Sequence, residues 1–323
     1  MDTLTETGPV KSADQIIETA RLLAVKSGKK MVAVASAADT DVLDALASAN
    51  ADGILDATLF GDSDKIKIAA VEGDVDISNF TIEHEADVSM AACGAVKMAA
   101  EGKADVVMKG FVSTSALLKT VLSRQFDLRT ENTLSHTAVL DIPGYHKLLQ
   151  ITDGGMVVKP NLDQKLQIME NAVLVARALG LDPVKVALSG AVDKVYDSIP
   201  ATAMCKDFIY RAAELNLPDV LIQGPLTFDA ATSSEIVALK GLDGPVAGDA
   251  DIYLTDSIEE CNIIAKALIN FAETVFSGVI VGAKVPVSLV SRTDTVKNKK
   301  SSVSIACLIA EYYKRIDLSG GVR

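Results

Sequence analysis

A short polar turn near the C-terminus carries side chains that could bind and activate an anionic substrate. Residues 291–295 follow an apolar strand expected at 278–282, and they include Ser291, Arg292 and Asp294. The planar guanidinium of an arginine can hold a phosphate through paired hydrogen bonds. A serine hydroxyl can donate to an acyl oxygen, and an aspartate carboxylate can accept a proton. Taken alone, the segment is better explained as a capped loop with a surface arginine.

A second polar turn follows a buried strand expected at 104–109. A glycine permits a sharp change of direction there, and three hydroxyl residues then open a helix. The candidate ligands of this stretch are Lys109, Gly110, Ser113, Thr114, Ser115 and, further along the helix, Lys119. Ligands of parallel sheets bind beyond the carboxyl ends of strands, and a helix N-terminus favours a phosphate. Ordinary capping explains the hydroxyl groups equally well, and the basic residues that follow favour anion binding.

Three further polar residues complete the set of candidates for substrate binding. Asn262 and Lys266 are one turn apart on a helix expected at 258–273, so they share a face. A solvated helix face explains this spacing equally well. Lys284 lies in the stretch that leads to Ser291 and is assigned to substrate binding with it.

The composition argues against nucleic acid and membrane partners. The 323 residues carry a formal net charge of −12, so a general attraction for nucleic acid is not expected. An anionic substrate would need a local basic pocket instead. No apolar run reaches the roughly 18 residues that cross a bilayer, and residues 1–8 lack the pattern of a signal peptide. We therefore expect a cytoplasmic protein.

The cysteines and histidines give no indication of a metal site. The four cysteines are far apart and form no CxxC pair, and no histidine has metal-ligand spacing. We expect reduced, buried thiols and structural or surface histidines. Phosphate-loop, dinucleotide, HExxH and GxSxG motifs are also missing from the sequence.

Short apolar strands alternate with amphipathic helices along the whole chain, which predicts an α/β fold with mostly parallel sheets. Further strands are expected near 31–35, 53–60, 81–83, 136–140, 147–151, 185–189, 219–222 and 251–254. Further helices are expected near 12–27, 39–47, 63–71, 86–101, 161–179, 198–214, 229–239 and 300–314. Aromatic residues make up only 4% and apolar residues 49%, so small aliphatic side chains must build the core, as in buried parallel strands.

Five segments occur in the order found in one enzyme family. They are KADVVMKGFVSTSALLKTVL, LSHTAVLDIPGYHKLLQITDGG, LIQGPLTFDAAT, GPVAGDADIYLTDSIEECNIIAKAL and VGAKVPVSLVSRTDT. Together they resemble the phosphate acetyl/butyryltransferase family over nearly the whole chain. The SHxA element, the Thr152-Asp153 pair, the GPL element with Asp229, and the C-terminal SRxD turn resemble the phosphate butyryltransferase branch more closely.

This resemblance implies a fold and an assembly. We expect two α/β/α lobes of the isocitrate/isopropylmalate dehydrogenase type, with the active site in the cleft between them. One lobe would contain residues 1–134 and 286–323, so that the last helix completes it, and the other would contain residues 135–285. The family forms homodimers or larger homo-oligomers. It uses coenzyme A as a substrate and needs no tightly bound cofactor or metal.

The resemblance also implies a reaction, the reversible transfer of a short-chain acyl group between coenzyme A and phosphate. The partners would then be acyl-CoA, phosphate and acyl phosphate. Arg292 would bind the phosphoryl group, Ser291 would steady the carbonyl oxygen, and Asp294 would handle the thiol proton. In the acetyltransferase branch an aspartate proposed as the base falls near Asn298 of this chain, and a CoA-binding arginine falls near Lys119.

Three alternatives remain open at this point. The chain could be a phosphate acetyltransferase, which a panel of acyl-CoA substrates would reveal. It could be a metal- and NAD-dependent decarboxylating dehydrogenase, a similar fold, although the aspartate cluster for a divalent metal is missing from the sequence. It could also bind CoA or acyl phosphate without turnover, because an asparagine occupies the usual position of the base.

Overall fold

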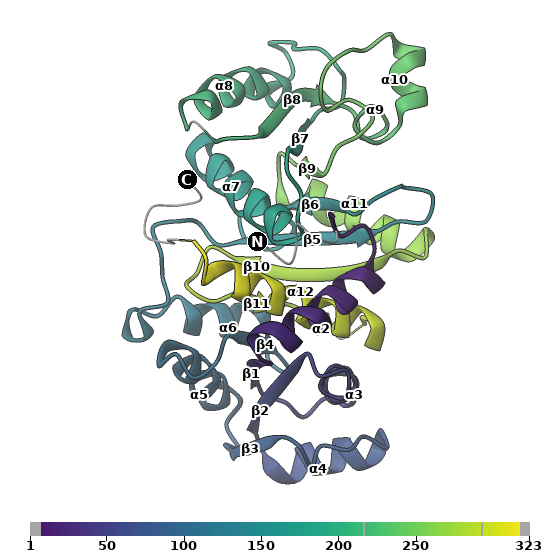
Figure 1. Cartoon of the computed structure of the whole chain (residues 1–323). Coiled ribbons are helices and arrows are strands. Elements are labelled where there is room, and N and C mark those ends of the chain that lie inside the picture. Colours follow the sequence, from purple (N-terminus) through teal and green to yellow (C-terminus); the bar gives the residue numbers. More distant parts are fainter. Residues whose placement is uncertain (1–7, 216, 292, 317–323) are drawn as a thin grey trace. The chain divides into compact units, whose positions relative to one another are not determined.

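The computed structural model describes residues 8–215, 217–291 and 293–316, and they form two compact units. The N-terminal unit contains residues 13–132 and 276–316, and the central unit contains residues 8–12 and 133–275. Helices and mostly parallel strands alternate in both, so the predicted α/β fold class is confirmed (Figure 1). Within the described ranges, no helix combines the length and apolarity that a membrane crossing requires.

The sheet of the N-terminal unit has the strand order β3-β2-β1-β4-β11-β10. Its strands are β1 (Lys30–Ala35), β2 (Leu55–Gly61), β3 (Thr81–His84), β4 (Val106–Lys109), β10 (Val275–Val281) and β11 (Val287–Ser288). Neighbours from β3 through β11 are parallel, whereas β10 runs antiparallel to β11. Apolar residues fill the central strands without interruption, because helices cover them.

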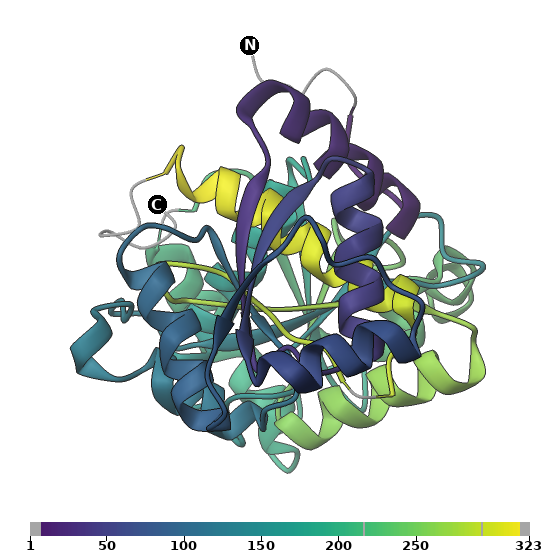
Figure 2. The same ribbon diagram turned by 90° about the horizontal axis from the view of Figure 1, so that it is seen from below.

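Helices pack on the two faces of this sheet (Figure 2). They are α2 (Ala13–Ser27), α3 (Thr40–Ala51), α4 (Ser63–Glu72), α5 (Val88–Ala100), α6 (Thr114–Val121) and α12 (Val296–Tyr313), with a short 3-10 helix η1 (Arg124–Phe126). α12, in yellow, packs against α2 and α3 on one face, and α5 packs against β1 and β2 on the other. The last helix of the described chain thus completes the unit that begins with α2.

The strands of the central unit lie in the order β5-β6-β9-β7-β8. Its strands are β5 (Ser135–Asp141), β6 (Leu149–Thr152), β7 (Val184–Ser189), β8 (Val220–Leu226) and β9 (Ile252–Leu254). β6, β9, β7 and β8 are parallel, and β5 is antiparallel to β6. The helices are α7 (Leu162–Ala178), α8 (Pro200–Glu214), α9 (Phe228–Thr232), α10 (Ser234–Lys240) and α11 (Ile258–Phe271). α7 and α8 bury their apolar faces against β7 and β9.

The boundaries of the two units differ from those expected from the sequence. Residues 276–285 lie in the N-terminal unit, because β10 pairs with β11 there through Val279 and Ile280. Residues 8–12 lie in the central unit, where the Val10 N–H donates to the carbonyl of Leu179 at 2.9 Å.

Two expected helices also need correction. The helix expected at 229–239 is interrupted at Ser233, whose side chain caps α10 by accepting from the Ile236 N–H. The helix expected at 300–314 begins at Val296, because Thr295 caps it by accepting from the Asn298 N–H. Local capping by hydroxyl side chains therefore decides both boundaries.

Candidate active site

Two polar turns of the N-terminal unit leave neighbouring strands at the same edge of the sheet. β4 and β11 are parallel partners, with Val107 opposite Val287 and Met108 opposite Ser288. The chain continues from β4 into the first turn of α6, and from β11 into the turn before α12. Because carboxyl ends of parallel strands meet at one edge, the sequence segments at 109–115 and 289–294 lie together there.

The turn after β4 brings the backbone close to the end of β1. A Cβ atom added to Gly110 would lie 2.2 Å from the carbonyl oxygen of Ser36, so only glycine fits at this position. Ser113 caps α6, since its hydroxyl accepts from the Ala116 N–H at 3.2 Å. Ser113 and Ser115 are exposed, and Thr114 is half-buried. This helix end presents first-turn N–H groups and hydroxyls, the groups that a phosphate or carboxylate needs.

The turn after β11 is closed by its own aspartate. Asp294 is buried, and its carboxylate accepts from the Ser291 N–H at 2.6 Å, while the Asp294 N–H donates to the carbonyl of Ser291 at 3.2 Å. The Ser291 hydroxyl lies 3.1 Å from the Thr293 hydroxyl. Arg292, the predicted phosphate ligand, lies outside the described residues. We call the described residues Ser291, Thr293 and Asp294 the catalytic turn, after the role expected of this segment from the sequence.

Two buried lysines hold the backbone on either side of the catalytic turn. Lys109 ends β4 and donates to the carbonyl of Val290 at 3.3 Å and to that of Gly110 at 3.4 Å. Lys299, on α12, donates to the carbonyl of Asp294 at 2.6 Å and to the Asp41 carboxylate at 3.2 Å. Lys109 was predicted as a substrate ligand at the end of a strand, and in the structure it is buried and donates to these main-chain carbonyls. Lys299 was missed, because the helix was expected to begin at residue 300 and three neighbouring lysines look alike in the sequence.

The remaining predicted residues of the N-terminal unit lie away from the catalytic turn or serve its packing. Lys119 is exposed in the last turn of α6. Lys284 precedes β11, so it lies at the amino end of that strand, where it pairs with Asp127 at 2.8 Å. Asn298 is buried, and its side chain accepts from the Phe276 N–H at 3.3 Å. Asn298 therefore joins α12 to β10.

Asn262 and Lys266 lie in the central unit, on α11. The Asn262 side chain donates to the carbonyl of Gly154 at 3.4 Å, just beyond the carboxyl end of β6. The positive charge of Lys266 acts on His136 of β5. Both candidates thus lie at the carboxyl end of the parallel strands of their own unit, where a ligand is expected.

A buried aspartate and histidine occupy the same end of the central sheet. The Asp153 carboxylate accepts from the N–H groups of His136, Gly155, Met156 and Val157 at 2.8–3.1 Å. Burial raises the pKa of Asp153, although these N–H bonds oppose the rise. Burial, with the charge of Lys266, lowers the pKa of His136 to about 4, so this imidazole is neutral at pH 7. The SHxA and Thr152-Asp153 elements marked both residues in the sequence, but not their chemistry.

A pocket of about 310 Å³ opens beside Phe111 in the N-terminal unit. Its lining combines apolar side chains such as Ile68 and Val88 with Lys65 and with three carboxylates, those of Asp62, Glu72 and Glu85. These carboxylates make it a poor host for a phosphate. Within the described ranges, no group of three or more histidine, cysteine, aspartate or glutamate side chains is arranged to hold a metal ion.

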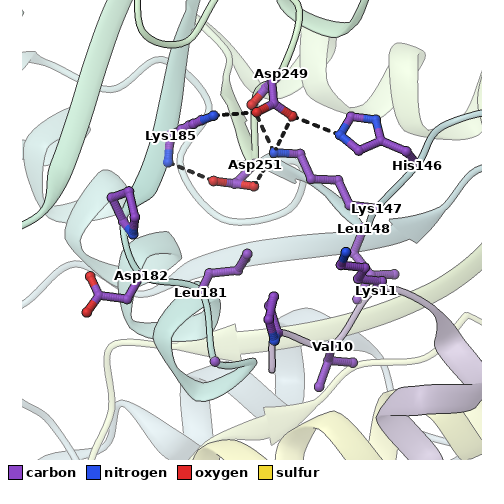
Figure 3. A pocket seen from close by; sticks show the side chains of 13 residues that line it. Val10, Lys11, His146, Lys147, Leu148, Leu181, Asp182, Lys185, Asp249 and Asp251 are labelled. Atoms are coloured by element: carbon purple, nitrogen blue, oxygen red, sulfur yellow. Dashed lines mark hydrogen bonds and ion pairs between the residues drawn. The ribbon is translucent and has the colours of Figure 1, made fainter. Parts of the chain in front are cut away.

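A second pocket, of about 330 Å³, lies in the central unit at the amino ends of β6, β7 and β9, and we call it the edge pocket (Figure 3). Lys147 contacts Asp251 at 2.6 Å and Asp249 at 2.8 Å, and Asp249 also accepts from Lys185 and contacts His146 at 2.9 Å. Burial would raise the pKa of Asp249, but the hydrogen bonds from Lys147 and Lys185 hold it well below its usual range. Cations and carboxylates neutralise one another in this pocket.

Comparisons with known proteins identify the family of this chain. The family model described as phosphate acetyl/butaryl transferase matches residues 85–307. A phosphate butyryltransferase of Clostridium acetobutylicum is 38% identical over 93% of this chain and 99% of its own length. A phosphate acetyltransferase of Thermotoga maritima is 35% identical over 67% of this chain and 74% of its own.

A solved structure is similar over most of the chain. The branched-chain phosphotransacylase from Enterococcus faecalis V583 aligns with a TM-score of 0.78 and 30% identity, covering 87% of this chain and 99% of that one. Fold, sequence and family model therefore lead to one assignment. The chain belongs to the phosphate acetyl/butaryl transferase family and is a phosphate acyltransferase.

Proposed function

We propose that this enzyme transfers a short-chain acyl group reversibly between coenzyme A and inorganic phosphate, with butyryl-CoA as its substrate. The similarity to a phosphate butyryltransferase along nearly the whole of both chains supports the butyryl group. The observation that carries the proposal is the meeting of two polar turns at one sheet edge, with two buried lysines beneath the catalytic turn. Such an arrangement suits an anionic substrate in a protein of net charge −12.

The reaction needs positioning and charge stabilisation rather than a covalent enzyme intermediate. A phosphate oxygen attacks the thioester carbonyl carbon, the carbon–sulfur bond breaks, and the phosphate proton ends on the sulfur of the departing CoA. We assign Arg292 to the phosphate and the Ser291 hydroxyl to the carbonyl oxygen. The N–H groups at the start of α6, near Ser113 and Ser115, complete the phosphate site.

Asp294 has two proposed tasks that one substitution separates. Its carboxylate closes the catalytic turn, and we propose that it also relays the proton to the CoA sulfur. In Asp294→Asn the side-chain oxygen still accepts from the Ser291 N–H, but the basic group is lost. We expect kcat to fall about 10²-fold and its pH profile to change while the phosphate KM is kept. If Asp294→Asn keeps a normal kcat and pH profile, Asp294 only closes the turn and does not relay the proton.

Further features of the proposal come from the family. We propose that Asn262 and Lys266 bind CoA, that Lys119 and Lys284 add positive charge for anionic substrates, and that no tightly bound cofactor is needed. A homodimer or larger homo-oligomer, located in the cytoplasm, is proposed as well. Light scattering and cell fractionation test the last two points. The family assignment selects an acyltransferase over the decarboxylating dehydrogenase.

The proposed function is tested by following free CoA with a thiol reagent. Butyryl-CoA should release CoA only when phosphate is present, with saturation in both substrates. Acetyl-, propionyl- and branched acyl-CoA then rank chain length, and a clear preference for acetyl-CoA would make the enzyme a phosphate acetyltransferase. CoA binding in calorimetry without any turnover would instead indicate a binding protein.

A further inference from the structure

Lys299 occupies a position that helix stability does not explain. It lies in the first turn of α12, four residues after the cap Thr295, and only 1% of it is exposed. The positive end of the helix dipole disfavours a cation there. Burial adds a desolvation cost that must be compensated by hydrogen bonds or a counter-charge. A residue kept at such a cost is a candidate for a role in function.

The contacts of Lys299 lead to the catalytic turn. Its ammonium group donates to the carbonyl of Asp294 at 2.6 Å, and the Asp294 carboxylate accepts from the Ser291 N–H at 2.6 Å. The only carboxylate partner of Lys299 among the described residues is Asp41, at 3.2 Å, whose side chain is 51% exposed. Lys299 is therefore linked to Ser291 through one residue, and its charge is only partly neutralised.

A second buried lysine acts on the other side of the turn. Lys109 is 7% exposed and donates to the carbonyl of Val290, the residue before Ser291. The backbone is thus held before and after the turn by ammonium groups from two different elements, β4 and α12.

We infer that Lys299 is a positioning residue for phosphate, with Lys109 as the matching anchor on the other side of the catalytic turn. Lys299 fixes the Asp294 carbonyl, and Asp294 fixes the Ser291 amide, so the residues on both sides of the proposed phosphate ligand Arg292 in the sequence are held before phosphate arrives. Groups fixed in advance cost less to order on binding. The inference rests on the proposed function and adds a residue to the phosphate side of that site.

The experiment compares two neighbouring lysines of α12. Lys299→Met removes the ammonium group, Lys299→Arg keeps the charge, and Lys300→Met is the matched control. Lys300 contacts Asp52 at 2.6 Å and Ser48 at 2.8 Å, away from the turn. For Lys299→Met we expect kcat/KM for phosphate to fall about 10²-fold, because small displacements of positioned groups have effects of this size. The KM for butyryl-CoA should stay within about twofold, Lys299→Arg should recover part of the loss, and Lys300→Met should resemble the wild type.

The outcomes separate positioning from a purely structural role. A folded Lys299→Met enzyme with unchanged phosphate kinetics, or with equal loss for both substrates, overturns the inference. If Lys299→Met does not fold, Asp41→Asn is used, which removes the half-exposed partner of Lys299 and should raise the phosphate KM about threefold. An unchanged phosphate KM in Asp41→Asn would then overturn the inference.

A binding measurement keeps the inference separate from the proposed function. If the wild type releases no CoA, the proposed function fails, and inorganic phosphate is titrated into wild type and Lys299→Met by calorimetry. Weaker phosphate binding by Lys299→Met supports the positioning role. Equal affinity, or no binding by either protein, overturns it.

Discussion

The catalytic turn and the edge pocket both gather lysines at the ends of parallel strands, but they treat the charge differently. Around the catalytic turn, Lys109 and Lys299 donate to main-chain carbonyls of Val290 and Asp294, and Lys299 also pairs with the half-exposed carboxylate of Asp41 at 3.2 Å. In the edge pocket, Lys147 and Lys185 are bound to aspartate carboxylates (Figure 3). A carbonyl directs a lysine, whereas a carboxylate neutralises it.

The two regions also lie at opposite ends of their strands. The catalytic turn follows the carboxyl end of β11, whereas the edge pocket lies at the amino ends of β6, β7 and β9. Ligands of open α/β sheets bind at carboxyl ends, where helix N-termini also point. A cluster of lysines therefore indicates an anion site only under two conditions. The partners of the lysines must not fully neutralise their charge, and the cluster must lie at the carboxyl ends of the strands.

The largest expected effect on kcat/KM comes from removing one cation in each region by substitution. Arg292→Ala should lower kcat/KM for phosphate by about 10²- to 10³-fold, as loss of a charged donor to the reacting group does. Lys185→Met, in the edge pocket, should leave kcat/KM per folded enzyme within about twofold. Steady-state phosphate titrations measure both. Normal turnover by Arg292→Ala would refute the phosphate assignment, and a large loss in Lys185→Met would break the comparison.

The edge pocket should contribute to the stability of the fold rather than to catalytic turnover. Asp251 has a side chain only 3% exposed and pairs with Lys147, itself 12% exposed. Asp251→Asn leaves that cation undercompensated, and we expect the free energy of unfolding to fall by about 3 kcal/mol. Urea denaturation gives the value, and kcat of the folded variant should be unchanged. Glu18→Gln, which breaks an exposed ion pair on α2, is the control and should cause no measurable change.

The two histidines of the central unit sharpen the comparison through pH. His136, at the carboxyl end of the strands, has a pKa lowered to about 4 by burial, while His146 in the edge pocket is exposed. The unfolded chain binds a proton at His136 more readily than the folded protein does. The contribution of neutral His136 to the free energy of unfolding is therefore complete above pH 6.5 and is lost as the pH falls toward 4. The loss from this residue is at most about 3 kcal/mol.

Urea denaturation between pH 7 and pH 4 tests this loss. His136→Gln should show a shallower decline of stability with falling pH than the wild type. A decline in His136→Gln as steep as in the wild type would show that this imidazole does not titrate as its burial requires.

Much of the fold follows from patterns that are local in the sequence. The apolar strands β1 and β4 and the amphipathic helix α2 were predicted within two residues, because each has a strong pattern and a clear end. β11 was not predicted as a strand, since two residues after Pro286 carry no periodicity. Its place between β4 and β10 depends on tertiary pairing, which a single sequence does not encode locally.

The candidate site was predictable in part for a similar reason. Ser291 and Ser113 follow strands, and this order indicates the ligand edge of a sheet. Lys299 was not predictable from type or spacing, because Lys297, Lys299 and Lys300 look equivalent in the sequence. The structure distinguishes them: Lys297 pairs with Asp14 on the surface, Lys300 pairs with Asp52, and Lys299 is buried under the catalytic turn.

The most direct test of acyl transfer to phosphate follows the phosphate oxygens themselves. The enzyme is incubated with butyryl-CoA and with phosphate in which all four oxygens are oxygen-18, and the masses of the products are measured by mass spectrometry. Attack of a phosphate oxygen on the carbonyl carbon predicts butyryl phosphate that keeps all of the label, formed mole for mole with free CoA. Free butyrate without label, released together with CoA, would contradict the account.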